Sequence, residues 1–312
     1  MENFIVCLNA VLPMFIIMSV GYFVKRIGLL LEDDIPRFNK IVFRVFMPCV
    51  VFYNLYSSDL SVAAQPRLIL FTLAAVLGSY AVIALIVPRF VKNPEQRGVM
   101  IQGIYRSNYV VIGLPIATAL VPASELGIVS LLIAFVVPVF NVLAVVTLEV
   151  FRGGRVPVRK TLVSILTNPL IIGAALGTLA LALKIKLPTA ADSVVRQLAS
   201  VGTPLQLFLL GGFFNFSGIA KHKKPLFWAV FGKLVLLPAA VLPIAVLLGF
   251  RGTALVALVG CFASGNAIAS FVMTQQMGGD AELAGDIVVL TSSLCAVTVF
   301  CWLFLLKTLG LF

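Results

Sequence analysis

A short polar segment interrupts one of the apolar stretches of this sequence, at about 98–121. The segment reads RSNYVVIGLP, from Arg106 to Pro115. Asn108 competes for backbone hydrogen bonds through its short amide, Gly113 loosens the backbone, and Pro115 has no N–H to donate. An unpaired backbone group in hydrocarbon costs several kcal/mol, so a break at this depth requires protein or a water-filled cavity around it. The segment therefore favours a broken helix that binds a small solute; the alternative is an ordinary kinked membrane helix.

A second interruption of similar character lies near the C-terminal end of the sequence. Residues 263–270 read ASGNAIAS, and Asn266 follows Asn108 by 158 positions. Small residues let two backbones approach closely, so a helix-packing seam is one interpretation of this segment. If the two breaks meet, their half-helix N-termini present N–H groups and positive dipole ends to an anion. We therefore expect both amides to contact an anionic substrate; the alternative is that they only cap half-helices.

Basic side chains inside apolar stretches extend the candidate site. Arg106 can pair with a carboxylate through two hydrogen bonds, or it can lie nearer the cytoplasmic side and attract anions there. Arg44 is expected to reach the membrane interface, and Lys233 fits either position. The predicted substrate-binding residues are Arg106, Ser107, Asn108, Tyr109, Gln206, Gly265 and Asn266, with helix packing as the alternative for Tyr109 and Gln206. The predicted hinge residues are Pro48, Gly113, Pro115 and Pro204.

The composition places the chain in a membrane. Of its 312 residues, 61% are hydrophobic and 11% are charged, whereas soluble domains contain about 25% charged residues. The mean hydropathy is +1.12. The net charge of +11 falls in short clusters between apolar stretches, so we expect a lipid bilayer around the chain and no nucleic-acid partner.

Ten apolar stretches approach the length of about 20 residues that a bilayer requires. They run roughly over 4–24, 38–57, 67–88, 98–121, 126–151, 161–183, 193–216, 225–249, 252–276 and 286–309. The first has no basic segment before it and basic residues after it, so we expect it to remain as a helix and not to act as a signal peptide. The five cysteines lie in apolar runs without a C-x-x-C pair. We therefore expect no metal and no cofactor.

Basic residues are divided unevenly between alternate connections. One set of loops holds 14 of the 23 Lys and Arg residues and the other set holds 6, while Arg44, Arg106 and Lys233 lie inside apolar stretches. Basic loops favour the cytoplasm. We therefore expect a multi-pass protein of the cell membrane with both termini outside the cytoplasm.

The sequence also repeats itself at an interval of 156 residues. Pro13, Gly21 and Pro48 recur at equivalent places as Pro169, Gly177 and Pro204. The pattern predicts a first repeat over 1–151, a cytoplasmic linker over 152–160 and a second repeat over 161–312. Because each repeat holds five spans, an odd number, the second copy must enter the membrane with inverted topology. The predicted fold is an all-α integral membrane protein with ten transmembrane helices in a 5+5 inverted repeat and broken, crossing helices four and nine.

The segment from Arg106 to Pro115 resembles the Asn-x-x-x-x-Gly-x-Pro pattern in the fourth span of the auxin efflux carrier family, which includes bacterial relatives of the plant PIN transporters. The resemblance extends over 43–48, 167–170, 263–280 and 291–293, and so over essentially the full chain. It implies a scaffold and a mobile transport unit, carriage of small organic anions such as auxin-like weak acids out of the cytoplasm, and homodimers. Plant members have proline at both crossovers, where this chain has Ser107 and Gly265, and their long cytosolic loop is absent here.

Together these features predict a secondary transporter that exports small organic anions by alternating access. Proton- or sodium-coupled uptake is one alternative, and a membrane receptor or scaffold without flux is another. One histidine, no paired membrane acids and no H-E-x-x-H or G-x-x-x-x-G-K-[ST] motif argue against an enzyme and an ATP-driven pump. His222 is expected to be a solvated loop residue and Asp286 to cap the tenth span. Neither is expected to carry a proton across the membrane.

Overall fold

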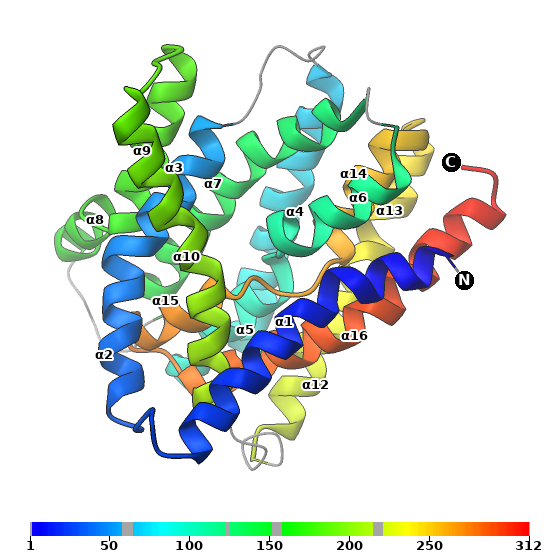
Figure 1. The fold of residues 1–312 in the computed structure, drawn as a ribbon. Coiled ribbons are helices and arrows are strands. Elements are labelled where there is room, and N and C mark those ends of the chain that lie inside the picture. The colour runs from blue at the N-terminus through cyan, green and yellow to red at the C-terminus, as the bar shows by residue number, and fades with distance from the viewer. Residues whose placement is uncertain (1, 58–64, 123–124, 152–157, 215–220, 312) are drawn as a thin grey trace.

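The computed structural model describes residues 2–57, 65–122, 125–151, 158–214 and 221–311, and this part of the chain contains helices and no strands (Figure 1). The α-helices are α1 (Glu2–Arg26), α2 (Asp34–Ile41), α3 (Met47–Tyr56), α4 (Pro66–Phe90), α5 (Pro94–Tyr105), α6 (Leu114–Leu120), α7 (Leu126–Val150), α8 (Val158–Leu166), α9 (Pro169–Ala182), α10 (Thr189–Phe213), α12 (Lys223–Phe231), α13 (Leu237–Leu247), α14 (Gly252–Ala263), α15 (Ala269–Met277) and α16 (Ala281–Thr308). Three π-helical segments join consecutive helices: η1 (Val42–Phe46), η2 (Tyr109–Gly113) and η4 (Gly232–Leu236).

Every apolar stretch singled out from the sequence is helical over most of its length. Within the described residues, five helical stretches have the length and hydropathy to cross a membrane. They are Asp34–Tyr56, Pro66–Phe90, Leu132–Val150, Lys223–Leu247 and Ala281–Thr308. The chain is thus an all-helical, multi-pass membrane protein. The count of ten spans and the crossing of the fourth and ninth spans stay predictions.

Each π-helical segment ends two residues before a proline. Pro48, Pro115 and Pro238 stand at the second position of α3, α6 and α13, directly after η1, η2 and η4. Proline has no N–H and its ring clashes with the carbonyl of the preceding turn, so a wider turn before it relieves both problems. Pro204 differs because it lies inside the continuous helix α10. Of the predicted hinges, Pro48, Gly113 and Pro115 therefore lie at distorted turns.

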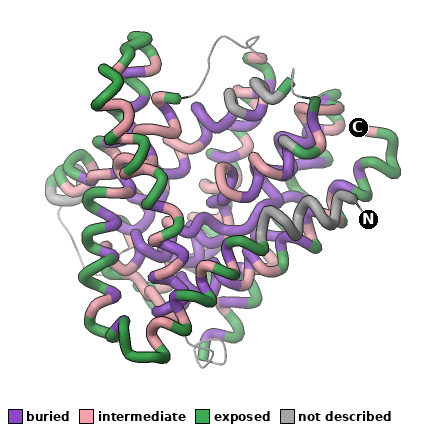
Figure 2. The backbone as a smooth tube through the Cα atoms, viewed as in Figure 1, coloured by how far each residue is buried: buried purple, intermediate pink, exposed green. Residues whose placement is uncertain are grey.

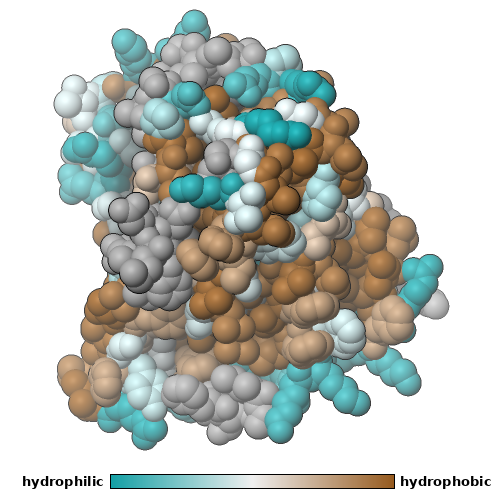
Figure 3. All heavy atoms as spheres, turned by 90° about the vertical axis from the view of Figure 1, so that its right-hand side faces the viewer, coloured by the Kyte–Doolittle hydropathy of each residue, from teal (hydrophilic) through white to brown (hydrophobic). Residues whose placement is uncertain are grey.

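The surface of the bundle carries many large apolar side chains. On α4, Leu70, Leu85 and Phe90 are exposed, the last at 80% of its full area. Figure 3 shows hydrophobic residues in a broad band over one face, with hydrophilic residues gathered mainly toward its two ends. Soluble monomers rarely expose apolar patches beyond a few hundred Å². The band fits contact with lipid tails.

The interior is densest around the two interrupted helices. In Figure 2 the segment that joins α14 to α15 runs through the middle of the bundle and is buried along its length. Residues 264–267 and 105–109 are all buried. The breaks predicted at both places are therefore enclosed by protein, as their unpaired backbone groups require.

Two helix pairs on the outside of the bundle pack with their backbones in close contact. A methyl group added at Gly21 of α1 would overlap the carbonyl oxygen of Phe208 in α10, and one added at Gly211 would overlap that of Met18. A methyl group added at Gly177 of α9 would lie 2.8 Å from the carbonyl oxygen of Phe52 in α3. Glycine is therefore required by space at these positions.

The described residues cover only part of the predicted linker between the two repeats. Residues 152–157 of the predicted linker lie outside the described residues, and Val158 already begins α8. The boundaries of the two repeats stay predictions.

Replacing Gly211 by alanine should separate α1 from α10 and lower stability by about 1–3 kcal/mol, the usual range for overpacking. Gly78 of α4 provides the matched control, because a methyl group there meets nothing within 4 Å. Gly78→Ala should leave the melting temperature unchanged or slightly higher, since alanine favours helix. Thermal unfolding of the purified variants in detergent measures both. Equal losses for the two variants would contradict the packing argument.

Candidate functional site

The two helix breaks meet and pair part of their backbones. α5 ends at Tyr105, and the chain runs extended through Arg106 before η2 begins. α14 ends at Ala263, and α15 begins at Ala269, after a break of five residues that contains Gly265. The N–H of Asn108 donates to the carbonyl oxygen of Gly265 at 2.8 Å. One break therefore satisfies a backbone group of the other, in an interior where each unpaired group is costly.

Asn266 is held by hydrogen bonds in the break that precedes α15. Its Oδ1 accepts hydrogen bonds from the N–H of Ala267 at 2.8 Å and from the hydroxyl of Ser270 at 3.1 Å. Its own N–H donates to Oγ1 of Thr291 in α16 at 2.9 Å. The side chain is 1% exposed. These hydrogen bonds are not a helix cap, because α15 begins after Ile268 and no side chain caps it. Contact of Asn266 with substrate stays a prediction.

Gly265 and Gly113 are held in close backbone packing. A methyl group on Gly265 would lie 2.9 Å from the carbonyl oxygen of Thr291, so glycine lets the break lie against α16. A methyl group on Gly113 would lie 2.7 Å from the carbonyl oxygen of Gly260 in α14. Both glycines therefore fix how closely the crossing region packs.

A cavity of about 100 Å³ opens beside the first break. Its walls come from α3, the segment 106–111, α7, α10 and the start of α15. Its polar lining consists of Asn54, Arg106, Ser107, Asn108, Tyr109, Asn141, Thr203 and Gln206. Its apolar lining includes Met47, Val50, Val51, Val110, Val111, Val137, Phe140 and Ile268. Five of the seven predicted binding residues thus line one cavity, while Gly265 and Asn266 do not.

Asn108 presents an unused hydrogen-bond donor at this cavity. The residue is 6% exposed, and its Nδ2 has no hydrogen-bond partner among the described residues. A buried polar atom without a partner costs about 1–3 kcal/mol. Such an atom in a cavity is a candidate donor for a ligand.

Arg106 is a buried cation on the same wall. It is 3% exposed, its Nη2 donates to Oδ1 of Asn141 at 2.7 Å, and its Nη1 lies 2.9 Å from Sδ of Met273. The ion pairs found among the described residues do not include Arg106. The side chain therefore lies in the protein interior at the cavity wall, and its depth in the membrane stays a prediction.

Lys233 places a second cation behind the first break. Its side chain is fully buried, and its Nζ donates to the hydroxyl of Ser107 and, at 3.5 Å, to the carbonyl oxygen of Phe262. It does not line the cavity, but the hydroxyl that it contacts does. The sequence left the position of this lysine open, because spacing from the nearest basic loop cannot tell which way a side chain points. Arg44, by contrast, is exposed, as expected.

The remaining predicted residues serve packing as well as lining the cavity. The hydroxyl of Tyr109 lies 3.5 Å from the carbonyl oxygen of Val129, and Nε2 of Gln206 donates to the carbonyl oxygen of Gly202 at 3.1 Å. Asn54, Asn141 and Thr203 were missed. The signal that could have found Asn141 is a lone amide inside an apolar helix, which is itself a functional hypothesis in a membrane protein.

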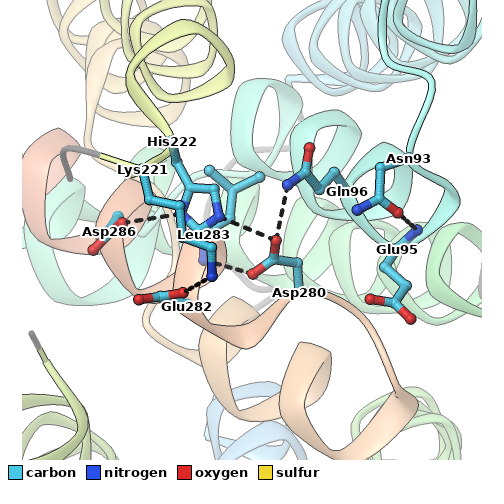
Figure 4. A network of polar contacts seen from close by, with 9 residues as sticks. All are labelled: Asn93, Glu95, Gln96, Lys221, His222, Asp280, Glu282, Leu283 and Asp286. Atoms are coloured by element: carbon cyan, nitrogen blue, oxygen red, sulfur yellow. Dashed lines mark hydrogen bonds and ion pairs between the residues drawn. The ribbon is translucent and has the colours of Figure 1, made fainter. Parts of the chain in front are cut away.

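Two expectations about a neighbouring polar group were wrong. His222 is not solvated but 3% exposed, and Asp280, not Asp286, caps α16 by accepting from the N–H of Leu283 at 3.0 Å (Figure 4). Asp286 lies six residues further along the chain, inside α16, and is 2% exposed. The sequence showed a basic loop around His222 but not the acidic helix start that folds over it.

Comparison with known proteins identifies the kind of molecule that contains this site. The family model described as "Membrane transport protein" matches residues 6–158 and 155–303, nearly the whole chain. An "Uncharacterized transporter" of Methanothermobacter thermautotrophicus (strain ATCC 29096 / DSM 1053 / JCM 10044 / NBRC 100330 / Delta H) is 36% identical over 53 residues. That alignment spans 17% of this chain and 18% of the relative.

The contrast between the two amides gives a prediction about stability. Asn266→Ala removes the two hydrogen bonds that Oδ1 accepts and should lower stability by about 1–2 kcal/mol. Asn108→Ala removes an amide nitrogen without a partner and should change stability by less than about 0.5 kcal/mol. Melting temperatures of the two variants in the same detergent check this. A larger loss for Asn108→Ala would show that its side chain is structural.

Proposed function

This chain belongs to the membrane transport proteins of the auxin efflux carrier type, and we propose that it is a secondary carrier that exports small organic anions by alternating access. The site is the cavity beside the first break, with Arg106 and the amide of Asn108 as the groups that contact the anion. The lipid bilayer surrounds the bundle, the membrane is the cell membrane, and both termini lie outside the cytoplasm.

The single observation that carries the proposal is the concentration of uncompensated hydrogen-bond donors and positive charge at the break. Arg106 and Lys233 are both buried, and neither forms an ion pair with an acidic group among the described residues. A buried charge is stabilised by a counter-charge or by several hydrogen bonds. A carboxylate in the cavity would provide that counter-charge and accept from Nδ2 of Asn108.

The shape of the polar and apolar lining bears on the kind of anion. Polar side chains line the cavity from the segment 106–109 and from Asn54, Asn141, Thr203 and Gln206, whereas valine side chains of α3, η2 and α7 form much of the rest of the wall. Small-molecule sites commonly combine apolar walls with a few polar groups that orient the ligand. A monocarboxylate with an apolar body matches this arrangement better than a solute that is charged at both ends.

A second cavity supports alternating access. It is lined by Phe43 and Arg44 of η1, by residues of α8 and α9, and by Gln276 and Met277 of α15. The stretch η1–α3 and the helix α15 each line both cavities, at different points along their length. The contact between Asn39 and Gln275 lies near the second cavity. Movement of α15 against α2 and α3 would open one cavity and close the other.

The helix packing supports an inverted repeat. Gly21 lies against Phe208, and Gly177 lies against Phe52. The two glycines are 156 residues apart, and so are the two phenylalanines, which is the repeat interval found in the sequence. The pairs are therefore related as an internal two-fold axis would relate them, which is the arrangement in which transporters place a site between their halves.

The basic connections support the proposed orientation. Gln276 donates to the carbonyl oxygen of Pro36, and the N–H of Asp280 donates to that of Glu95 at 3.2 Å. Lys221 pairs with Glu282 at 2.7 Å. Four connections of the lysine- and arginine-rich set thus meet at one end of the bundle, which should be the cytoplasmic end.

Loss of the cavity donors should abolish transport without unfolding the protein. In proteoliposomes supplied with a panel of radiolabelled organic acids, Asn108→Ala and Arg106→Gln should each lower the saturable flux about 10- to 100-fold, the value of a hydrogen bond to a charged group. Arg196→Gln, which makes the same change at an exposed position of α10, is the matched control. A flux that both cavity variants preserve would place the site elsewhere, and no flux of any acid would favour a receptor or scaffold.

The dependence of transport on membrane potential separates export from coupled uptake. A monoanion gains or loses about 2.3 kcal/mol per 100 mV, so its accumulation ratio should change about 50-fold over that range. The measurement sets potassium gradients with valinomycin at equal sodium and pH on both sides. Flux that ignores the potential but responds to a sodium or proton gradient would instead support coupled uptake.

A further inference from the structure

A buried histidine lies between two carboxylates at the end of the bundle where the basic connections meet (Figure 4). His222 precedes α12, and Nε2 of its ring lies 3.5 Å from Oδ2 of Asp280. The other ring nitrogen, Nδ1, lies 3.6 Å from Oδ2 of Asp286. The histidine and Asp286 are 4% and 2% exposed. The ring thus presents one nitrogen to each of two acidic side chains of α16.

The contacts of the cluster favour an imidazole ring that holds a proton on both nitrogens. A neutral ring has one N–H and would turn a lone pair toward one of the carboxylates. Nδ1 of His222 and Oδ2 of Asp286 are both buried, and neither makes a hydrogen bond within the described residues. A second ring proton would lie between these two atoms.

The charges around the ring also favour an added proton. The acidic groups that face the cluster from α16 and its cap are Asp280, Glu282 and Asp286, and Lys221 is a neighbouring cation. The hydrogen bond and charge of Glu282 raise the pKa of Lys221, so that lysine stays charged. An uncharged side chain of α5 also contacts the cluster: Nε2 of Gln96 donates to Oδ2 of Asp280 at 3.0 Å. With a neutral ring the cluster therefore carries an excess of negative charge.

The cluster joins the starts of three helices that build the proposed site. Ser107 lies eleven residues after Gln96, Lys233 lies eleven after His222, and Thr291 lies eleven after Asp280. Lys233 donates to Ser107, and Thr291 accepts from the N–H of Asn266. Over eleven residues a helix rises by about 16 Å. α16 covers this interval without a break, α12 passes into η4 before Lys233, and α5 ends at Tyr105, two residues before Ser107. The cluster and the break are thus connected by three segments of equal residue number.

We propose that His222, Asp280 and Asp286 form a proton-binding latch that holds α5, α12 and α16 in register and so sets the affinity of the proposed substrate site. The regulatory part rests on the proposed function; the proton site does not. The proton binds from the aqueous end of the bundle and bridges the ring to Asp286. Its loss leaves two carboxylates beside a neutral ring, and the three helix starts separate. Histidine is suited to this role because its ordinary titration falls between about pH 5 and 8.

The proton site can be tested directly, because the chain contains a single histidine. Solid-state NMR of histidine-labelled protein in lipid, free of any histidine tag, should show a doubly protonated ring at about pH 6 and a neutral ring by about pH 8.5. Asp286→Asn should move the transition toward lower pH by about one unit. Glu32→Gln, at an exposed ion pair with Lys25, should leave it in place. A ring that stays neutral throughout, or a transition unmoved by Asp286→Asn, would overturn the latch.

The regulatory part is tested by flux at equal pH on both sides of the membrane. The concentration for half-maximal flux should rise about fivefold or more from pH 6 to pH 8.5, within the usual range of coupling between sites. His222→Gln should remove this dependence, and Asp280→Asn, which keeps a helix-capping side chain, should weaken it. Identical pH profiles in wild type and His222→Gln would overturn the regulation. If no flux is found at all, the proposed function fails while the NMR titration still decides the proton site.

Discussion

The need to pair backbone groups inside an apolar bundle governs this structure. Two helices stop in the interior, and the hydrogen bond from Asn108 to Gly265 lets each break supply what the other lacks. Side chains provide further partners, as Asn266 does for the N–H of Ala267 and Thr291 for that of Asn266. Breaks of this kind are stable only when enclosed by protein, so the rest of the bundle is arranged around them. The cavity follows from the same constraint, because backbone that leaves the helix exposes polar groups to the space beside it.

Buried positive charge is the second organising feature. Arg106 and Lys233 lie on either side of Ser107, one at the cavity and one behind it. Burial of each charge costs free energy that hydrogen bonds to Asn141, Ser107 and a carbonyl oxygen offset in part. A site of this kind attracts an anion over a cation of the same size. Its apolar walls then add the hydrophobic contribution of any ligand body that they cover.

The sequence patterns predicted the location of the site better than the contacts of its individual side chains. Polar residues in an apolar stretch marked the break at 106–115, and five of seven predicted residues line the cavity. The same reasoning did not separate Asn108, whose amide nitrogen is unused, from Asn266, whose amide oxygen accepts two hydrogen bonds. It also misjudged His222, because a basic loop looks solvated until the helix that covers it is known. Spacing along one helix indicates a face, but not what packs against that face.

The sequence by itself determined that the chain is an all-helical membrane protein, where its helices lie and where two of them break. Hydropathy, proline and glycine act locally, so these properties are legible in the order of residues. Only the tertiary structure decided which breaks meet, which way Lys233 points and which acids surround His222. Those contacts join residues far apart in the chain, and their geometry depends on close backbone approaches such as that of Gly113 to Gly260. Such approaches are set by the packing of whole helices, and no local pattern specifies them.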